Sequence, residues 1–181
     1  ALLSVRNTVL RGQGRLNPTA GTLALVNRHF ALDKNRKAAQ DFELIRGVYR
    51  NMLALVHRNL GGAETTFTAA PGRFDFAKTL ISGVLAMTFS NGVNQKGVVN
   101  KGKAQDGSEI LIPADKILIM IRYRFITRDM QISTLIHEMA HYLGPPDGNP
   151  DSIDDPPGGN SASDQIAKLA PERRPRIAQC Y

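Results

Sequence analysis

The chain has 181 residues, of which 42% are hydrophobic and 22% are charged, and its formal net charge is +7. These values are typical of one globular domain that can bury a core without staples, and no apolar run approaches the ~20 residues that a membrane span needs. The single cysteine, Cys180, excludes an intramolecular disulfide framework and a cysteine-ligated zinc site.

The first residues contain arginines and no cleavage signature, so we expect no signal peptide. A start without Met fits a processed product or an excised domain. Basic residues are scattered over the chain and few aromatic residues lie among them. We therefore expect solvated basic surfaces and not a nucleic-acid-binding face.

Two helices are predicted in the first third of the chain. Asn17-Pro18 indicates an N-cap followed by proline at the first helical position, which predicts a helix that ends near Phe30. A longer helix is predicted over residues 36–59, before Gly61-Gly62. Its apolar positions recur at helical spacing and are Phe42, Ile45, Tyr49, Met52, Leu53 and Val56. His57, on the same helix, is expected to be an ordinary packed or surface histidine.

The middle of the chain is rich in β-forming residues. Short strands are predicted over residues 65–69, 73–77 and 84–89, which Pro-Gly and Asn-Gly separate. Residues 91–107 carry Gly, Asn and Lys and predict an exposed loop or a long hairpin tip. The apolar run "KILIMI", residues 116–121, predicts a buried strand that is central in its sheet.

A further helix is predicted over residues 127–143, with a core-facing stripe formed by Ile132, Leu135, Ile136 and Met139. The next segment, "GPPDGNPDSIDDPPGGNSASD", predicts an acidic, turn-rich loop. A last helix is predicted over residues 161–170. We therefore predict one α+β domain over residues 1–181, with N-terminal helices, a small, mostly antiparallel sheet, a motif helix and a C-terminal helix.

The motif helix contains "HEMAH", an HExxH pattern. His137 and His141 are four residues apart, so both can point a ring nitrogen at one metal ion. Glu138 is rotated by about 100° from His137, which places its carboxylate beside the ion, where it can take a proton from an attacking water. Such a pattern predicts a Zn²⁺-dependent hydrolase in which Glu138 is the general base.

The third metal ligand is open on spacing alone. The other two histidines lie far upstream, and Glu172 lies in an arginine-rich segment that we expect to face solvent. Asp147 completes HExxHxxGxxD, which is close to the short metzincin pattern. However, no methionine follows Met139 to form the turn that supports a metzincin site. Asp154 and Asp155 are the other candidates in the acidic loop.

The C-terminal third of the chain resembles the aspzincin metallopeptidases, the group of deuterolysin and peptidyl-Lys endopeptidase. The resemblance rests on "TLIHEMAH", on the Asp-rich loop that follows and on "LAPERRPRIAQCY". It implies a zincin-like fold and a zinc-dependent endopeptidase that acts on a protein or peptide. The segment "SIDD" stands where the family has its third ligand, and alignment of the terminal "AQCY" predicts Asp155 for it, with Asp154 and Asp147 as alternatives.

The chain departs from the family at two places. The turn tyrosine has no counterpart at residues 156–158, and Gln179 replaces the aspartate tied to lysine preference, so that specificity is not implied. Zincin toxin domains fused to bacterial secretion proteins are also similar to this chain. That similarity implies a secreted or delivered effector domain, with a fused delivery module or an immunity protein as its partner.

Two other functions stay open. HExxH reports water activation and not the substrate, so a zinc hydrolase such as a cell-wall amidase is one alternative. A basic nucleic-acid-binding module with a degenerate metal site is the other. In zincins the substrate usually lies along an edge strand, and we expect that edge among residues 65–89 or 109–112.

Overall fold

A computed structural model describes residues 20–70, 84–103, 107–146, 149–155, 166 and 168–181. These residues form an α+β domain. Its helices are α2 (Ala20–Phe30), α3 (Ala38–Leu60) and α4 (Arg128–Leu143), and its strands are β1 (Phe67–Ala69), β2 (Ala86–Met87), β3 (Val99–Lys103), β4 (Glu109–Pro113) and β5 (Ile117–Ile119). Five 3₁₀ helices join them in the described part: η1 (Leu32–Lys34), η3 (Gly92–Asn94), η4 (Ile121–Phe125), η5 (Pro171–Arg176) and η6 (Ala178–Cys180).

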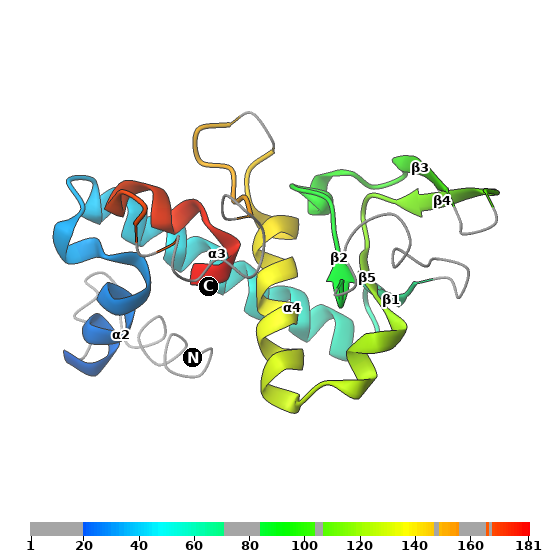
Figure 1. The fold of residues 1–181 in the computed structure, drawn as a ribbon, viewed down its shortest axis with the longest axis horizontal. Coiled ribbons are helices and arrows are strands. Elements are labelled where there is room, and N and C mark those ends of the chain that lie inside the picture. The colour runs from blue at the N-terminus through cyan, green and yellow to red at the C-terminus, as the bar shows by residue number, and fades with distance from the viewer. Residues whose placement is uncertain (1–19, 71–83, 104–106, 147–148, 156–165, 167) are drawn as a thin grey trace.

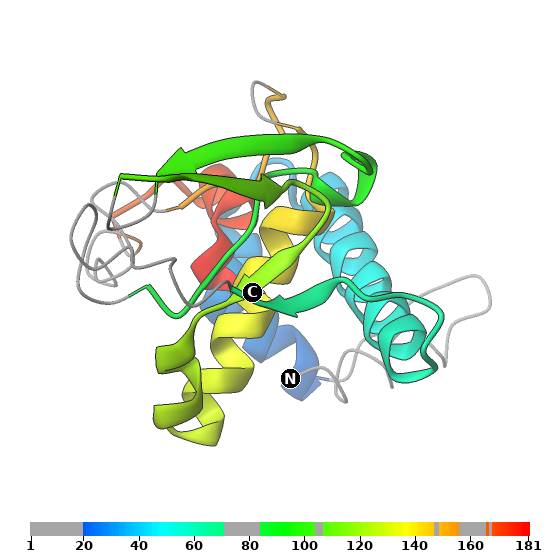
Figure 2. The same ribbon diagram turned by 90° about the vertical axis from the view of Figure 1, so that its right-hand side faces the viewer.

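Helix α4 stands between a helical side and a β side of the molecule (Figure 1). The helical side holds α2, the first part of α3 and the C-terminal segment, and the strands lie on the other side of α4. Helix α3 is the long element that crosses α4 and reaches both sides, and Figure 2 shows it next to α4. No described helix has both the length and the apolar character needed to cross a membrane.

The strands form two small sheets. In the three-stranded sheet, of order β1-β5-β2, β5 runs parallel to β1 and antiparallel to β2. Strand β5 is therefore central, as its apolar sequence predicts, and Ile117 and Leu118 are buried. Strands β3 and β4 form a separate antiparallel hairpin. The first sheet is thus mixed and not mostly antiparallel, and the predicted strand over residues 73–77 lies outside the described residues.

The core lies where α3 and α4 pack against β5 and the C-terminal segment. Met52 and Leu55 of α3 are fully buried and meet Ile136 and Met139 of α4 in one cluster. Both helices match their predicted extents to within about two residues. One prediction is wrong: Ile132 is exposed, because the first turns of α4 extend past the core.

The C-terminal segment also corrects the sequence analysis. Most of the predicted helix over residues 161–170 lies outside the described residues. The arginine-rich stretch that follows does not simply face solvent, because Pro175 is buried and Ile177 and Cys180 belong to the main core. Burial raises the pKa of the free Cys180 thiol to about 11. The Tyr49 hydroxyl of α3 donates to the Tyr181 main-chain oxygen at 2.5 Å, which ties this segment to α3.

Candidate metal centre

Thr127 and Gly144 flank helix α4 and mark where it begins and ends. Thr127 is extended and its hydroxyl accepts a hydrogen bond from the Met130 N–H, so it caps the first turn. At the other end, Gly144 leaves the helix and packs closely against the loop that follows. A Cβ on Gly144 would lie 2.9 Å from the Ala140 carbonyl oxygen and 3.2 Å from Ile153. The absence of a side chain therefore lets the acidic loop fold back over the last turns of α4.

Three predicted ligands meet above that helix. The Nε2 atoms of His137 and His141 are 3.3 Å apart, and the Asp155 Oδ1 atom lies 3.2 Å from the first and 3.4 Å from the second. Asp155 is more than half exposed, while both histidine side chains are largely buried. Helical spacing brings the histidines together, and the fold of the loop adds the carboxylate.

These separations fit a metal better than a cluster of hydrogen bonds. Two bonds of about 2.0–2.1 Å that meet at the tetrahedral angle place their ligand atoms about 3.3 Å apart. All three measured separations lie close to that value, and the three atoms are one face of such a tetrahedron. His137, His141 and Asp155 form the one group of this kind found in the described part of the chain.

The second nitrogen of His141 fixes the orientation of its ring. Its Nδ1 atom lies 2.6 Å from the Ile153 carbonyl oxygen. A carbonyl can only accept, so Nδ1 carries a proton, and Nε2 is the nitrogen that faces Asp155 and His137. Ile153 is fully buried against the end of α4, which holds that carbonyl in place. A partner of this kind is what orients histidine ligands in metal sites.

The loop that carries Asp155 is anchored to the C-terminal segment. Asp154 forms a parallel bridge with Ile177: its N–H donates to the Arg176 carbonyl at 2.9 Å, and its carbonyl accepts from the Ala178 N–H at 3.0 Å. Both bonds use the main chain of Asp154. They hold the residue immediately before Asp155 in an extended conformation.

The side chain of Arg176 forms the second anchor. Its guanidinium pairs with Asp151 of the loop and with Asp41 of α3. It also donates to the carbonyls of Pro150 and Glu172. Asp41 is fully buried, and its other carboxylate oxygen accepts a hydrogen bond of 2.7 Å from the Asn35 side chain. One arginine thus connects the acidic loop to the longest helix of the domain.

Glu138 lies beside the three ligand atoms and not among them. Its Oε1 atom is 4.0 Å from His137 Nε2, and its side chain is nearly buried. Burial raises the pKa of the Glu138 carboxyl, although the two histidines and a hydrogen bond from the Thr88 main chain oppose that shift. A carboxyl with a raised pKa, close to a metal site, is suited to accept and release a proton near neutral pH.

The negative charge of Asp155 and the protonated form of His141 favour each other. Hydrogen bonds with His137 and His141 lower the pKa of Asp155 far below its usual range, so it is a carboxylate at any physiological pH. Burial lowers the pKa of His141, but the hydrogen bond and charge of Asp155 outweigh this effect and raise it overall. Cations, whether protons or a metal ion, are therefore favoured between these side chains.

The alternative third ligands are placed differently. Asp154 is next to Asp155, but its carboxylate accepts a hydrogen bond from the Ser152 hydroxyl and does not join the group. Asp147 lies outside the described residues. Glu172 accepts a bond from the Arg36 N–H, near the start of α3.

Three supports of the site were missed in the sequence: the Ile153 carbonyl, the Thr88 main chain and the pairing of Asp41 with Arg176. The first two are main-chain groups and leave no signal in residue type. Asp41 does leave one, because it falls on the same helical face as Ile45 and Val48, where a carboxylate needs a partner.

Comparison with known protein families, curated proteins and solved structures returns no match to the chain.

Proposed function

We propose that the protein is a zinc-dependent endopeptidase related to the aspzincins. The observation that carries the proposal is the arrangement of two imidazole nitrogens and one carboxylate oxygen at the edge lengths of a tetrahedron, with Glu138 next to them. Three protein ligands leave a fourth position for water or substrate, which is the pattern of catalytic and not of structural zinc sites.

The donor set favours zinc over the other common divalent ions. Magnesium and calcium prefer sites made of oxygen, and here two of the three donors are imidazole nitrogens. Zinc accepts a mixture of nitrogen and oxygen donors and a tetrahedral arrangement without strain. His137, His141 and Asp155 would hold the ion, and the Ile153 carbonyl would keep the His141 ring in the tautomer that binds it.

Glu138 is the residue that moves protons in the proposed reaction. Zinc at this site would lower the pKa of an attacking water and polarise the scissile carbonyl. Glu138 would accept the proton of that water as it attacks and then donate it to the leaving amine. The burial of Glu138 supports this role, because a raised pKa makes the carboxylate a stronger base toward the attacking water than an ordinary one.

The free edge of β2 is the proposed place for the substrate main chain. Among the described strands, β2 pairs with β5 alone, and Thr88, which follows it, is hydrogen-bonded to Glu138. A peptide added in an extended conformation along this edge would pass next to the general base. Main-chain pairing of this kind gives affinity that does not depend on the substrate sequence.

The substitution Glu138→Gln tests the mechanism. It keeps the shape of the side chain and removes its basicity, so the variant should bind zinc with the wild-type stoichiometry while casein hydrolysis falls by roughly 10²–10⁴-fold. Glu43→Gln, on the exposed face of α3, is the control and should keep full activity. Wild-type casein hydrolysis by Glu138→Gln would rule out the proposed base. A wild-type protein that cleaves peptidoglycan and leaves casein intact would indicate the amidase instead.

A further inference from the structure

Residues 121–132 form a protruding segment at the foot of α4, which we call the basic apolar knob. It comprises η4, the connection to α4 and the first turns of that helix, and it lies at the end of the molecule away from the ligand loop (Figures 1 and 2). Four of its large apolar side chains are exposed, and they are Ile121, Phe125, Met130 and Ile132. Phe125 is the most open of them, at 77% exposure.

The knob has a defined conformation. The Tyr123 hydroxyl donates to the Gln131 carbonyl, and the Gln131 side-chain amide donates to the Tyr123 carbonyl, both at 3.0 Å. This reciprocal pair folds η4 back against the start of α4. Tyr123 is partly buried, whereas Arg122, Arg124 and Phe125 of the same 3₁₀ helix are exposed. The apolar side chains are therefore exposed on a segment that two hydrogen bonds hold in place.

The exposed charges of the knob are mostly positive. Three exposed arginines accompany one exposed aspartate, Asp129, and they are Arg122, Arg124 and Arg128. None of the three forms an ion pair with a carboxylate among the described residues. The Arg124 guanidinium instead lies 5.6 Å from the centre of the Phe125 ring. Basic and apolar side chains are thus mixed on one protruding segment.

We propose that the basic apolar knob docks onto an anionic lipid surface. Lipid head groups carry phosphates, which guanidinium groups bind with two parallel hydrogen bonds, and the acyl region directly below them accepts Phe, Ile and Met side chains. At that boundary the arginines can bind phosphates while the apolar side chains enter the acyl region. This is interfacial binding, in which no segment crosses the bilayer.

Two other acidic partners fit the knob less well. Nucleic acid offers phosphates, but it gives Ile121, Met130 and Ile132 no apolar region to enter. An acidic protein would bind the arginines, but the exposed apolar side chains of this protruding segment would need a matching groove in the partner. A membrane surface needs no such groove. The net charge of +7 also favours approach to an anionic surface.

Docking in this way would set the position of the candidate metal centre. Met130 and His137 are seven residues apart, so they lie on the same face of α4 with about 10 Å between them along the helix axis. The knob is near the membrane in the docked state, and the metal-ligand face is two helical turns above it. The inference concerns where the protein binds and does not depend on its catalytic activity.

The test is co-sedimentation with lipid vesicles. Vesicles of phosphatidylcholine with phosphatidylserine should bind the wild-type protein, and vesicles of phosphatidylcholine alone should bind it far less. Each arginine near an anionic surface contributes about a fivefold change in partitioning, so replacement of the three knob arginines by Gln should weaken binding on the order of 100-fold. The double variant Phe125→Ser with Ile121→Ser should weaken binding to the same vesicles without changing the net charge.

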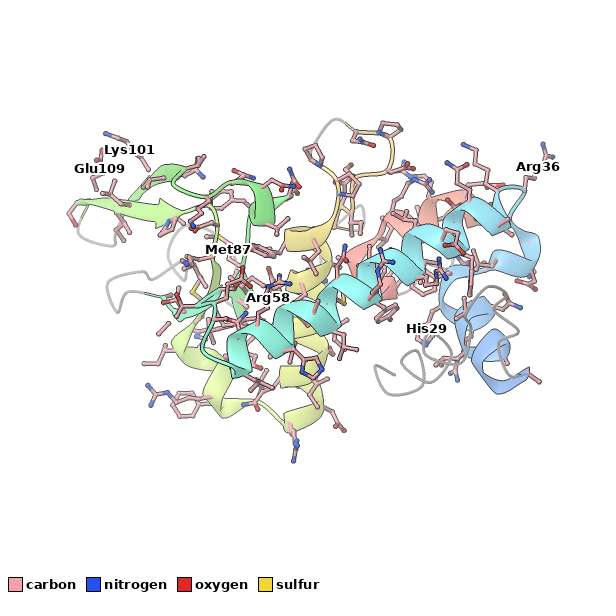
Figure 3. The ribbon with its side chains drawn as sticks, turned by 180° about the vertical axis from the view of Figure 1, so that it is seen from behind. His29, Arg36, Arg58, Met87, Lys101 and Glu109 are labelled. Carbon is pink, nitrogen blue, oxygen red and sulfur yellow. The ribbon has the colours of Figure 1, made fainter. Side chains whose placement is uncertain are left out.

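Matched controls separate the knob from general charge. The triple variant Arg28→Gln, Lys34→Gln, Arg36→Gln removes the same charge at the other end of the molecule, where Figure 3 shows Arg36, and should bind nearly as wild type. Leu111→Ser is the apolar control, on the hairpin that carries Lys101 and Glu109. Circular dichroism shows whether each variant is folded.

Three results would overturn the proposal. They are equal binding to the two kinds of vesicle, equal losses in knob and control variants, and displacement of the protein from vesicles by poly-glutamate or DNA at matched charge. The last would assign the knob to an acidic macromolecule. Glu138→Gln should bind vesicles like the wild type, so the lipid-binding result and the peptidase result can fail separately.

Discussion

The Arg176 guanidinium lies 3.0 Å from the carboxylate of Asp41, a side chain with no exposed surface. The contact is a charge pair and not an aligned hydrogen bond. The same guanidinium pairs with Asp151, four residues before the candidate ligand Asp155. A buried carboxylate of α3 is therefore connected to the position of the ligand loop.

Replacement of Arg176 by Met should destabilise the protein and weaken its metal binding. The substitution leaves the buried Asp41 charge without its cationic partner, which typically costs about 3–5 kcal/mol. The loop also loses its side-chain anchor, so zinc affinity should fall about 10–100-fold, as it does when other outer supports of metal sites are removed. Urea unfolding and competition with a chromophoric zinc chelator measure the two effects.

Arg46→Met is the matched control, since Arg46 pairs with Glu43 on an exposed face of α3. It should cost no more than about 1 kcal/mol and leave zinc affinity unchanged. The double variant Arg176→Met with Asp41→Asn removes the unpaired charge and should recover part of the stability. If it also recovered the full zinc affinity, anchoring of the loop by Arg176 would be wrong.

Gly144→Ala should disturb the same loop from the other side. The new methyl group would lie 2.9 Å from the Ala140 carbonyl oxygen and 3.2 Å from Ile153, so either the helix end or the loop must move. We expect a loss of about 1–3 kcal/mol, as for other insertions into packed regions. The shift of Ile153 should weaken its hydrogen bond with His141 and lower zinc affinity as well.

A second glycine provides the control. Gly47 lies within α3, and a Cβ built on it has no neighbour within 4 Å. Gly47→Ala should therefore stabilise the protein by up to about 1 kcal/mol through helix propensity. Thermal unfolding of the two variants should shift in opposite directions. Equal shifts would mean that the packing at Gly144 is not the cause.

The sequence predicted α3 and α4 well because their signals are local. Thr127 marks the start of α4, Gly144 its end, and the spacing of His137 and His141 follows from helix geometry alone. The central place of β5 was also predictable, since an uninterrupted apolar strand needs cover on both faces. The exposure of Ile132 was not, because periodicity gives the direction of a side chain and not the extent of the core.

Local sequence signals do not distinguish the candidate third ligand, Asp155, from its neighbour. Asp154 and Asp155 are adjacent and chemically identical, and only the bridge between Asp154 and Ile177 determines which carboxylate turns toward the histidines. That bridge joins segments that are 23 residues apart (177 − 154) and contains no side-chain contact. Main-chain pairing of this kind is decided by the whole fold and leaves no mark in residue type.

Glu138→Gln should raise the stability of the metal-free protein at neutral pH. The folded-state pKa of Glu138 is raised by burial, so ionisation is less favourable in the folded than in the unfolded protein. Below the unfolded pKa, near 4.5, both states are protonated and the two proteins should be equally stable. As pH rises through the folded pKa, the wild type alone bears the cost of a buried charge.

Thermal unfolding in excess chelator, followed from pH 4 to pH 8, measures this difference. The gap should open as pH rises and then stay constant, with Glu138→Gln the more stable protein. Glu43→Gln, at an exposed position, should show no such gap. A wild type more stable than Glu138→Gln at neutral pH would contradict the burial effect.

Substitution of the three loop aspartates distinguishes the possible metal ligands. Asp155→Ala removes an oxygen that lies 3.2 Å and 3.4 Å from the two histidine nitrogens, and zinc affinity should fall on the order of 100-fold or more. Because the Asp155 side chain is 55% exposed, the metal-free protein should keep its fold.

Asp154→Ala is the closest control, since its bridge with Ile177 uses the main chain and survives the change. Asp147→Ala tests the metzincin spacing, and both controls should keep zinc and activity. Zinc should also dissociate from the wild type as pH falls, because protons compete with the metal ion for its ligands. Zinc retention by Asp155→Ala together with its loss from Asp147→Ala would assign the third ligand to Asp147.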